Sequence, residues 1–360
     1  MYPERGTRAD IDLSHLVHNI EVFKKRHTGP VIGVVKADAY GHGLARVTDA
    51  LISCDALAVA TIEEAVQLRT FIPDKRIILL EGVFNHTELE LAIEKQFDVV
   101  VHQFYQLDLI LDSDLKTSGV SVWLKVDTGM NRLGFSWQDY PQVLTQLQQS
   151  NRVKEIRLMA HFAQSDDADS SQTQRQIERN QILMNHGLDV SFANTGAVLN
   201  NLSCPGEWAR VGLGLYGISP LPNQFAADFN LKPVMQLSAK LISIKTATEG
   251  ESVGYSASFT CPKDISVGIV GMGYADGYPW SSHHSQVVIR GHQAPVIGRV
   301  SMDMLAVDLS AVEQPLIGEP VEIWGNQQPV EQVAQDLHTI PYTLVCGITG
   351  RVKFYVHDQH

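Results

Sequence analysis

Residues 31–43 read VIGVVKADAYGHG, in which an apolar run ends at Lys36. Its first five residues are apolar without polar alternation, as expected of a strand buried on both faces of a parallel sheet. Lys36 follows the strand directly. The apolar spacing of residues 13–23 indicates an amphipathic helix before it.

Similar apolar runs recur along the first two-thirds of the chain, separated by helical patterns. At the start of one predicted helix, over residues 61–68, Thr61 and Glu64 form a capping-box pattern. Eight β units alternating with helices predict a (β/α)₈ barrel of the TIM type, with a doubly wound open sheet as the competing architecture. The remaining seven runs cover residues 56–61, 76–82, 98–102, 121–128, 156–162, 190–195 and 207–213.

The pattern changes after residue 223, where strands and turns replace helical spacing until residues 330–337. We therefore predict a barrel domain over residues 1–229 and a mostly β domain over residues 230–360. The first residues of the chain are a segment that can pack on the β domain. The strands expected there cover residues 241–246, 265–270, 286–289, 295–300, 305–309 and 321–324.

The composition argues against nucleic-acid-binding, membrane-spanning and secreted proteins. The formal net charge is -12 and no basic block stands out, which argues against nucleic acid as a partner. No apolar stretch is long enough to span a bilayer, and no apolar run follows the first charges, so we expect neither a membrane span nor a signal peptide. The four cysteines lie far apart in the sequence, as is typical of reduced thiols in a cytoplasmic protein.

Polar side chains gather at the predicted C-terminal ends of the barrel strands, where active sites of such barrels lie. Lys36 is either a nucleophilic amine for Schiff-base chemistry or a surface lysine at a loop mouth; its position alone does not decide. Several convergent groups favour a site over isolated rim residues. The others are Lys125, Asp127, Arg132, His161, Asn194, Thr195 and Arg210.

Residues 212–217, GLGLYG, match the dinucleotide pattern GxGxxG but fail its context, because the following ISPLPN cannot open a helix. Glycines at the end of the last barrel strand suit a phosphate instead. No HExxH metal motif and no GxSxG nucleophile elbow occurs, so we expect no metal site and no hydrolase of that type.

Motifs in order along the chain resemble those of the bacterial alanine racemase family. They are VKADAYGHG (35–43), LKVDTGMNRLG (124–134), AHFA (160–163), RVGLGLYG (210–217), VGY (253–255), GYADGY (273–278), GRVSMDM (298–304) and IPY (340–342). The resemblance implies a pyridoxal-5′-phosphate (PLP) enzyme that interconverts L- and D-alanine for peptidoglycan synthesis. It also implies a homodimer in which each active site joins the barrel of one subunit to the β domain of the other.

The resemblance further implies roles for single residues. Lys36 carries the cofactor and is one acid/base group; Tyr255 is the opposing one. Arg210 faces the pyridine nitrogen, and His161 contacts either Arg210 or the ring. The residues that hold the cofactor's phosphate are Tyr40, Thr195, Tyr342 and the backbone of Gly212 and Leu213, and Asn194 also binds the cofactor. The residues that meet the substrate are Arg132, Met302, Asp303 and Tyr274.

Some family members carry a carbamylated lysine at the place of Lys125, whose negative charge orients Arg132. Three alternatives stay open. They are a racemase of the same fold that acts on serine or another small amino acid, a decarboxylase with the same barrel and β domain, and a non-catalytic PLP-binding protein. The decarboxylases share both domains, but the motifs match the racemases better. The non-catalytic PLP-binding proteins resemble the barrel alone.

Overall fold

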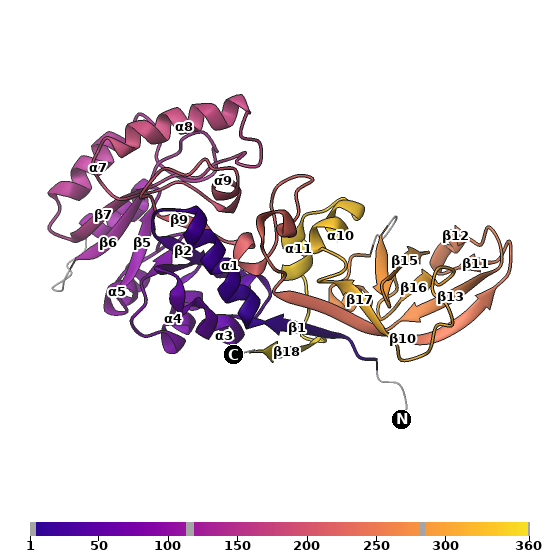
Figure 1. Ribbon diagram of the computed structural model, residues 1–360. Coiled ribbons are helices and arrows are strands. Elements are labelled where there is room, and N and C mark those ends of the chain that lie inside the picture. Colours follow the sequence, from indigo (N-terminus) through magenta and orange to yellow (C-terminus); the bar gives the residue numbers. More distant parts are fainter. Residues whose placement is uncertain (1–4, 113–118, 281–284, 359–360) are drawn as a thin grey trace. The chain divides into compact units, whose positions relative to one another are not determined.

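The computed structural model of the protein describes residues 5–112, 119–280 and 285–358. The chain divides into two compact units. The barrel unit consists of Val17–Leu215 and Ser219–Gln224. The β unit consists of the chain up to Leu16, Tyr216–Ile218 and the residues from Phe225 onward. Figure 1 shows helices around parallel strands in the first unit and mainly strands in the second. No helix in the described ranges is long and apolar enough to cross a membrane.

The barrel unit contains eight parallel strands in the order β8-β7-β6-β5-β4-β3-β2-β9. The ends of this sheet meet, because Trp208 N–H donates to Val190 O (2.8 Å) and Arg210 N–H donates to Ala193 O (2.9 Å). The predicted eight-stranded barrel is therefore confirmed. The strands are β2 (Val31–Val34), β3 (Ala56–Val59), β4 (Ile77–Leu79), β5 (Phe97–Val101), β6 (Val120–Lys125), β7 (Val153–Met159), β8 (Val190–Ser191) and β9 (Ala209–Val211).

Helices alternate with these strands as predicted. Thr61 caps α4, and both halves of the capping box with Glu64 are present, which confirms that interpretation. The helical segments up to the last barrel strand are α1 (Leu13–Arg26), α2 (Lys36–Tyr40), α3 (Leu44–Val47), η1 (Thr48–Ser53), α4 (Ile62–Phe71), α5 (His86–Glu94), α6 (Phe104–Leu111), α7 (Tyr140–Gln149), α8 (Ser171–Met184) and α9 (Thr195–Leu199), followed by η2 (Leu213–Tyr216).

The barrel core explains the uninterrupted apolar runs in the sequence. Every residue of β2, β3, β4 and β5 is buried, because side chains on one face fill the barrel and those on the other meet the helices. Burying each of these aliphatic side chains stabilises the folded protein by about 1.5–3 kcal/mol. Asp98 is the one charged residue within these four strands, and it accepts a hydrogen bond from Trp123 Nε1 (2.9 Å).

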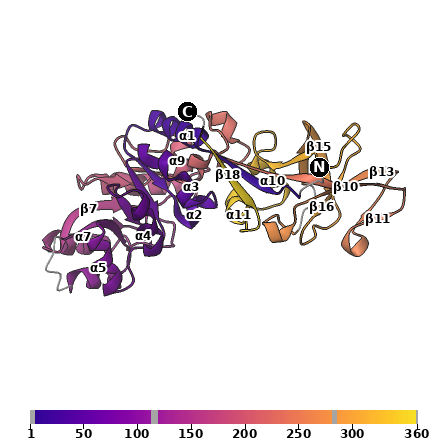
Figure 2. The ribbon, with the colours of Figure 1, turned by 90° about the horizontal axis from the view of Figure 1, so that it is seen from below.

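The β unit is built around β10 (Met235–Ala247), a long strand that pairs with β17 on one side and with β13 further along. Figure 2 shows β10 beside β13. The pairing of β10 with β13 closes a ring through β16, β15, β14 and β17. The other elements are η3 (Ala226–Phe229), β11 (Ser252–Val253), η4 (Tyr255–Ala257), β12 (Phe259–Thr260), β13 (Ile265–Val270), η5 (Tyr274–Asp276), β14 (Gln286–Ile289), β15 (His292–Ile297), β16 (Leu305–Asp308), β17 (Pro320–Trp324), α10 (Val330–Asp336) and α11 (Pro341–Cys346).

Two strands that the sequence analysis did not predict complete this sheet. β1 (Arg8–Asp12) pairs antiparallel with β10 and parallel with β18 (Lys353–His357), so both chain ends join the β unit. Both strands are short, and their partners are distant in sequence, so local patterns identify them poorly.

Candidate active site

Lys36 lies directly after β2, and its side chain is exposed at the C-terminal end of the barrel strands. The next residues, 37–40, all have φ between 52° and 55° and form a left-handed turn. This conformation costs roughly 1–2 kcal/mol for each L-residue. Two carboxylates hold the turn: Glu64 Oε1 accepts from Ala37 N–H (2.7 Å) and Asp38 Oδ1 from Leu44 N–H (2.6 Å). Tertiary contacts, not local preference, therefore set the backbone beside Lys36.

The ends of β8 and β9 form a cradle of backbone and hydroxyl groups. Thr195 Oγ1 accepts from the N–H groups of Gly212 (3.1 Å) and Gly214 (3.5 Å). A Cβ on Gly212 would lie 2.4 Å from Tyr40 Oη, so only glycine allows the hydroxyl to approach this backbone. The cradle brings together predicted cofactor-binding residues of the barrel unit: Tyr40, Asn194, Thr195, Gly212 and Leu213.

Arg210 on β9 is almost fully buried, and its guanidinium group donates hydrogen bonds to several acceptors. Its Nη1 donates to the carbonyl (2.7 Å) and hydroxyl (2.6 Å) oxygens of Ser191. Its Nη2 donates to Ala160 O (2.6 Å) and His161 Nδ1 (2.9 Å). Burial lowers the pKa of Arg210 to about 10, so the side chain stays charged near neutrality. Its Nε–H donates to no residue in the described ranges, which leaves one donor for a ligand.

His161 is neutral in this setting. An arginine only donates, so Nδ1 of His161 accepts the bond from Arg210 and the ring proton resides on Nε2. Burial, followed by the charges of Arg210 and Lys125, holds the pKa of His161 well below its usual value. The imidazole therefore adds a neutral hydrogen-bonding group, not another positive charge.

A cluster of cations surrounds this histidine. Lys125, at the end of β6, is 8% exposed, and burial followed by the charge of Arg210 lowers its pKa to about 7. Arg132 lies exposed in the next loop, where Asp127 Oδ1 accepts from the N–H groups of Gly129 (2.8 Å) and Asn131 (3.1 Å). Such a site suits anions. Across the described residues, no three or more His, Cys, Asp or Glu side chains form a group that could hold a metal ion.

The predicted substrate-binding residues of the β unit lie together. Tyr274 N–H donates to Ser301 O (3.1 Å) and Ala275 N–H donates to Met302 O (2.9 Å), so η5 runs beside the segment 301–303. Tyr274 and Met302 are exposed, and Asp303 is half-buried. They are therefore available on the surface of this unit.

Tyr255 and Tyr342 occupy other segments of the β unit. Tyr255 is 68% exposed and begins a turn in which Ser256 has a φ of 59°. Arg299 Nη1 donates to Ser256 Oγ (3.0 Å), and the guanidinium of Arg299 lies 5.3 Å from the centre of the Trp280 ring. Tyr342 lies in the first turn of α11 and is partly exposed.

Three supporting residues escaped the sequence analysis. Ser191 holds Arg210, Glu64 holds the turn after Lys36, and the buried Asp276 organises the segment around Tyr274. The capping-box pattern predicted the role of Glu64 at the start of α4, but nothing in the sequence predicted its hydrogen bond with Ala37 N–H. Asp276 falls within the motif GYADGY, whose acidic residue had no assigned role.

Comparisons with known proteins agree with this arrangement. Residues 11–220 match the family described as "Alanine racemase, N-terminal domain" and residues 234–356 match "Alanine racemase, C-terminal domain". An alanine racemase of Nitrosococcus oceani is 41% identical over 96% of this chain and 98% of its own. The biosynthetic alanine racemase of Pseudomonas aeruginosa superimposes with a TM-score of 0.95 at 38% identity, covering 98% of this chain and 100% of its own.

A further structural relative is the alanine racemase of Bartonella henselae with covalently bound pyridoxal phosphate. It has a TM-score of 0.88 at 27% identity, and the match covers 98% of this chain and 100% of its own. Both domain matches occur in order, and full-length relatives share about two-fifths of their residues. The chain belongs to the alanine racemase family.

Proposed function

We propose that this protein is an alanine racemase that interconverts L-alanine and D-alanine with PLP as its cofactor and supplies D-alanine for peptidoglycan synthesis. One observation carries most weight beside the family match. The buried, charged Arg210 retains an unused Nε–H beside a neutral histidine, at the same barrel rim as Lys36. A donor in that place suits an aromatic ring nitrogen that accepts a hydrogen bond.

The residues of the barrel unit fit PLP. The cationic cluster and the cradle of Tyr40, Thr195 and Gly212 suit an anionic phosphate, and Lys36 offers an accessible amine for covalent attachment. We assign Asn194, Leu213 and Tyr342 to the phosphate end as well, following the family. When bound, PLP withdraws electrons from the substrate's α-carbon and makes the α-proton acidic.

Racemisation requires one group to take the α-proton from one face and another to return a proton to the opposite face. We assign these tasks to the Lys36 Nζ and the Tyr255 hydroxyl. Arg210 remains charged and donates only, so a pyridine nitrogen that accepted its hydrogen bond would stay unprotonated. Such a pairing would limit how far electrons are drawn into the cofactor and would disfavour transamination.

We infer that the protein is a homodimer with shared active sites. Tyr255 and Met302 are 68% and 53% exposed on their own chain, which suits residues that complete the site of a partner subunit. We assign Arg132 and the Met302–Asp303 segment to the substrate carboxylate and Tyr274 to the wall of the site. The family match supports this arrangement.

Lys125 is proposed to react with carbon dioxide. Only a neutral amine attacks carbon dioxide, and a pKa of about 7 leaves a large neutral fraction at physiological pH. The new bond joins Nζ to the carbon of CO₂, and one proton leaves to solvent. The resulting carbamate places a negative charge beside Arg132 and Arg210, in a site otherwise crowded with cations.

We further propose a reducing, cytoplasmic location. Cys54, Cys204, Cys261 and Cys346 are all free thiols. Two of them, Cys54 and Cys261, are buried, and burial raises the pKa of Cys54 to about 12, which keeps that thiol unreactive. Free cysteines are typical of proteins that work where thiols stay reduced.

The first experiment records the visible spectrum of the purified protein and assays D-alanine after L-alanine is added. We expect a yellow absorption band that Lys36→Ala loses and that Tyr255→Phe keeps while racemisation is lost. Tyr355→Phe, which alters another exposed tyrosine of the β unit, is the matched control and should remain active. A protein that stays colourless with added PLP would contradict the proposal, and a yellow protein that racemises serine instead would change the substrate.

A mixing experiment tests the shared sites. Lys36→Ala and Tyr255→Phe are each expected to be inactive, but subunit exchange between them creates dimers with one intact site. Random exchange should restore about a quarter of wild-type activity. If no activity returns although exchange is shown by mass-tagged subunits, each site is built from one chain alone.

A further inference from the structure

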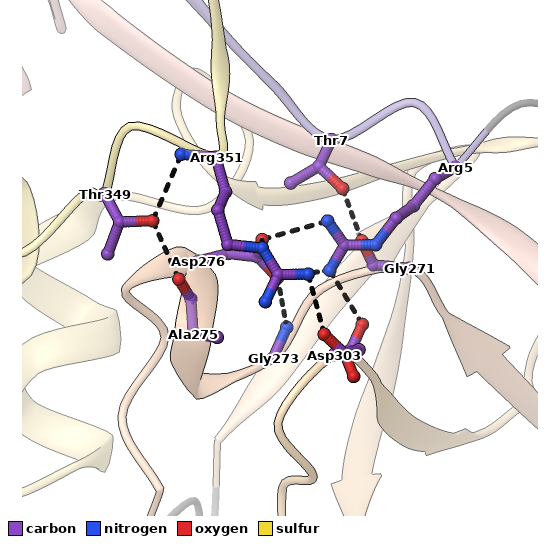
Figure 3. Close-up of polar contacts among 9 residues, drawn as sticks. All are labelled: Arg5, Thr7, Gly271, Gly273, Ala275, Asp276, Asp303, Thr349 and Arg351. Atoms are coloured by element: carbon purple, nitrogen blue, oxygen red, sulfur yellow. Dashed lines mark hydrogen bonds and ion pairs between the residues drawn. The ribbon is translucent and has the colours of Figure 1, made fainter.

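A charge cluster in the β unit lies outside the proposed acid/base groups (Figure 3). At its centre, the Asp276 side chain is fully buried. Arg5 Nη1 donates to its Oδ1 (2.9 Å), Arg5 Nη2 forms an ion pair with its Oδ2, and Gly273 N–H donates to Oδ2 (2.9 Å). Arg351 Nε lies 3.5 Å from its Oδ1. One buried carboxylate thus anchors two guanidinium groups.

Both guanidinium groups extend from Asp276 to Asp303. Arg351 Nη2 donates to Asp303 Oδ1 (2.6 Å), and Arg5 Nη2 donates to the Asp303 carbonyl (2.8 Å). The chain before Arg351 is also fixed, because Thr349 Oγ1 donates to Ala275 O (2.7 Å). The backbone and the carboxylate of Asp303 are therefore each held by an arginine that is itself anchored.

The cluster is balanced in charge, since Arg5 and Arg351 offset Asp276 and Asp303. Asp303 differs from Asp276 because its side chain is 48% exposed, so its charge can act on a molecule that approaches from outside. Arg351 is the only arginine in the described residues that bonds to the Asp303 carboxylate. Without Arg351, Asp303 would present an uncompensated negative charge.

We propose that Arg351 is a positioning residue that neutralises and orients Asp303, so that the Met302–Asp303 segment accepts a substrate carboxylate instead of repelling it. This inference rests on the proposed function, in which that segment meets the carboxylate of alanine. Arg351 acts through Asp303 and does not itself need to touch the substrate.

The proposal predicts a rise in KM with little change in kcat. In Arg351→Met we expect KM for alanine to rise about five- to tenfold, the size of a repulsion between two partly hydrated charges a few ångströms apart. Arg351→Lys keeps the charge and should stay within about twofold of the wild type. In an Asp303→Asn background, the Arg351→Met substitution should leave KM unchanged, because no charge remains to be offset. Arg290→Met, which removes another exposed arginine of the β unit, is the matched control.

Two further measurements separate this role from a loss of folding. Raising the salt concentration should lower KM in Arg351→Met more than in the wild type, because salt screens the exposed repulsion. Propionate, a carboxylate without an amino group, should raise the Tm of the wild-type holoenzyme and lose this effect in Arg351→Met. An unchanged KM in Arg351→Met, or a KM rise that persists with Asp303→Asn, would overturn the inference. A wild-type protein that does not racemise alanine would instead refute the proposed function.

Discussion

Replacing Lys125 by methionine is expected to stabilise the barrel unit near neutral pH. Lys125 is 8% exposed, and burial, followed by the charge of Arg210, lowers its pKa from 10.5 to about 7. Each pKa unit is worth about 1.4 kcal/mol. Protonated Lys125 therefore costs the folded protein roughly 5 kcal/mol relative to the unfolded chain. Methionine keeps the apolar stem and removes this cost.

The sign of the pH dependence follows from proton binding. Between about pH 7 and 10.5 the unfolded chain holds the Lys125 proton and the folded protein has released it, so wild-type stability rises with pH. The advantage of Lys125→Met is therefore largest near pH 6 and shrinks by about 1.4 kcal/mol for each pH unit above 7.

The assay is urea unfolding of cofactor-free protein at half-unit steps from pH 6 to 9.5, in buffer free of carbon dioxide. Trp123, Trp137 and Trp208 lie in the barrel unit and report its unfolding by fluorescence. Lys154→Met is the control, because Lys154 is an exposed lysine on the neighbouring strand β7. Wild-type and Lys125→Met stabilities that run parallel across this range would refute the reasoning, since Lys125 would then be equally protonated in both states.

Bicarbonate provides the second arm of this experiment. If carbon dioxide converts the Lys125 amine to a carbamate, added bicarbonate near pH 7.5 should stabilise the wild type and leave Lys125→Met unchanged. Mass spectrometry under non-denaturing conditions should then show the added carbon dioxide. A wild-type stability that does not respond to bicarbonate would leave the lowered pKa intact and contradict the carbamate.

Three other substitutions test the cofactor site and the barrel core. Arg210→Glu replaces a permanent donor by a carboxyl group that can share a proton with the ring nitrogen, so pyruvate formation from alanine should rise in a lactate-dehydrogenase-coupled assay; no rise would contradict the assigned role. Gly212→Ala places a Cβ 2.4 Å from Tyr40 Oη and should weaken PLP affinity about tenfold, measured by fluorescence titration. Trp123→Phe removes the indole donor to the buried Asp98 (2.9 Å) and should cost about 1–3 kcal/mol in urea unfolding.

The barrel could be predicted because the burial of each strand is visible in the strand's own residues. Strands buried on both faces are mostly apolar, and β2, β3 and β4 contain no polar side chain. The same logic predicted the candidate site, since a polar residue at the end of such a strand lies on the rim. Lys36 and His161 were predicted in this way, and Arg210 was predicted from its place within the last strand. The sequence itself did not point to Tyr255 or Met302, whose single motifs look like ordinary packing residues; they came from the family resemblance alone.

The N-terminal strand of the β unit was missed although a signal existed. Residues 8–12, RADID, alternate polar and apolar side chains, and their burial alternates in the same way. Five residues are too few to separate this alternation from chance. What stabilises β1 is its pairing with β10 and β18, more than two hundred and three hundred residues away, respectively.

The turn after Lys36 could not have been predicted by any local rule. Ala37, Asp38 and Ala39 have no preference for positive φ, and glycine begins only at Gly41. Contacts made by Glu64 and by Asp38 itself hold the conformation. Strain held by the surrounding structure is common at functional sites, and here it directly adjoins the proposed cofactor lysine.

The chain carries a net charge of -12, yet it concentrates cations around His161. Burial is the main cause of the lowered pKa values of Lys125 and Arg210, and neighbouring positive charges lower both further, so this crowding is unfavourable. An anion that binds there relieves the repulsion, so part of the binding energy is already stored in the folded protein. Phosphate, substrate carboxylate and a Lys125 carbamate would all bring negative charge to this cluster. Each should therefore strengthen folding of the barrel unit, and each should do so less in Lys125→Met.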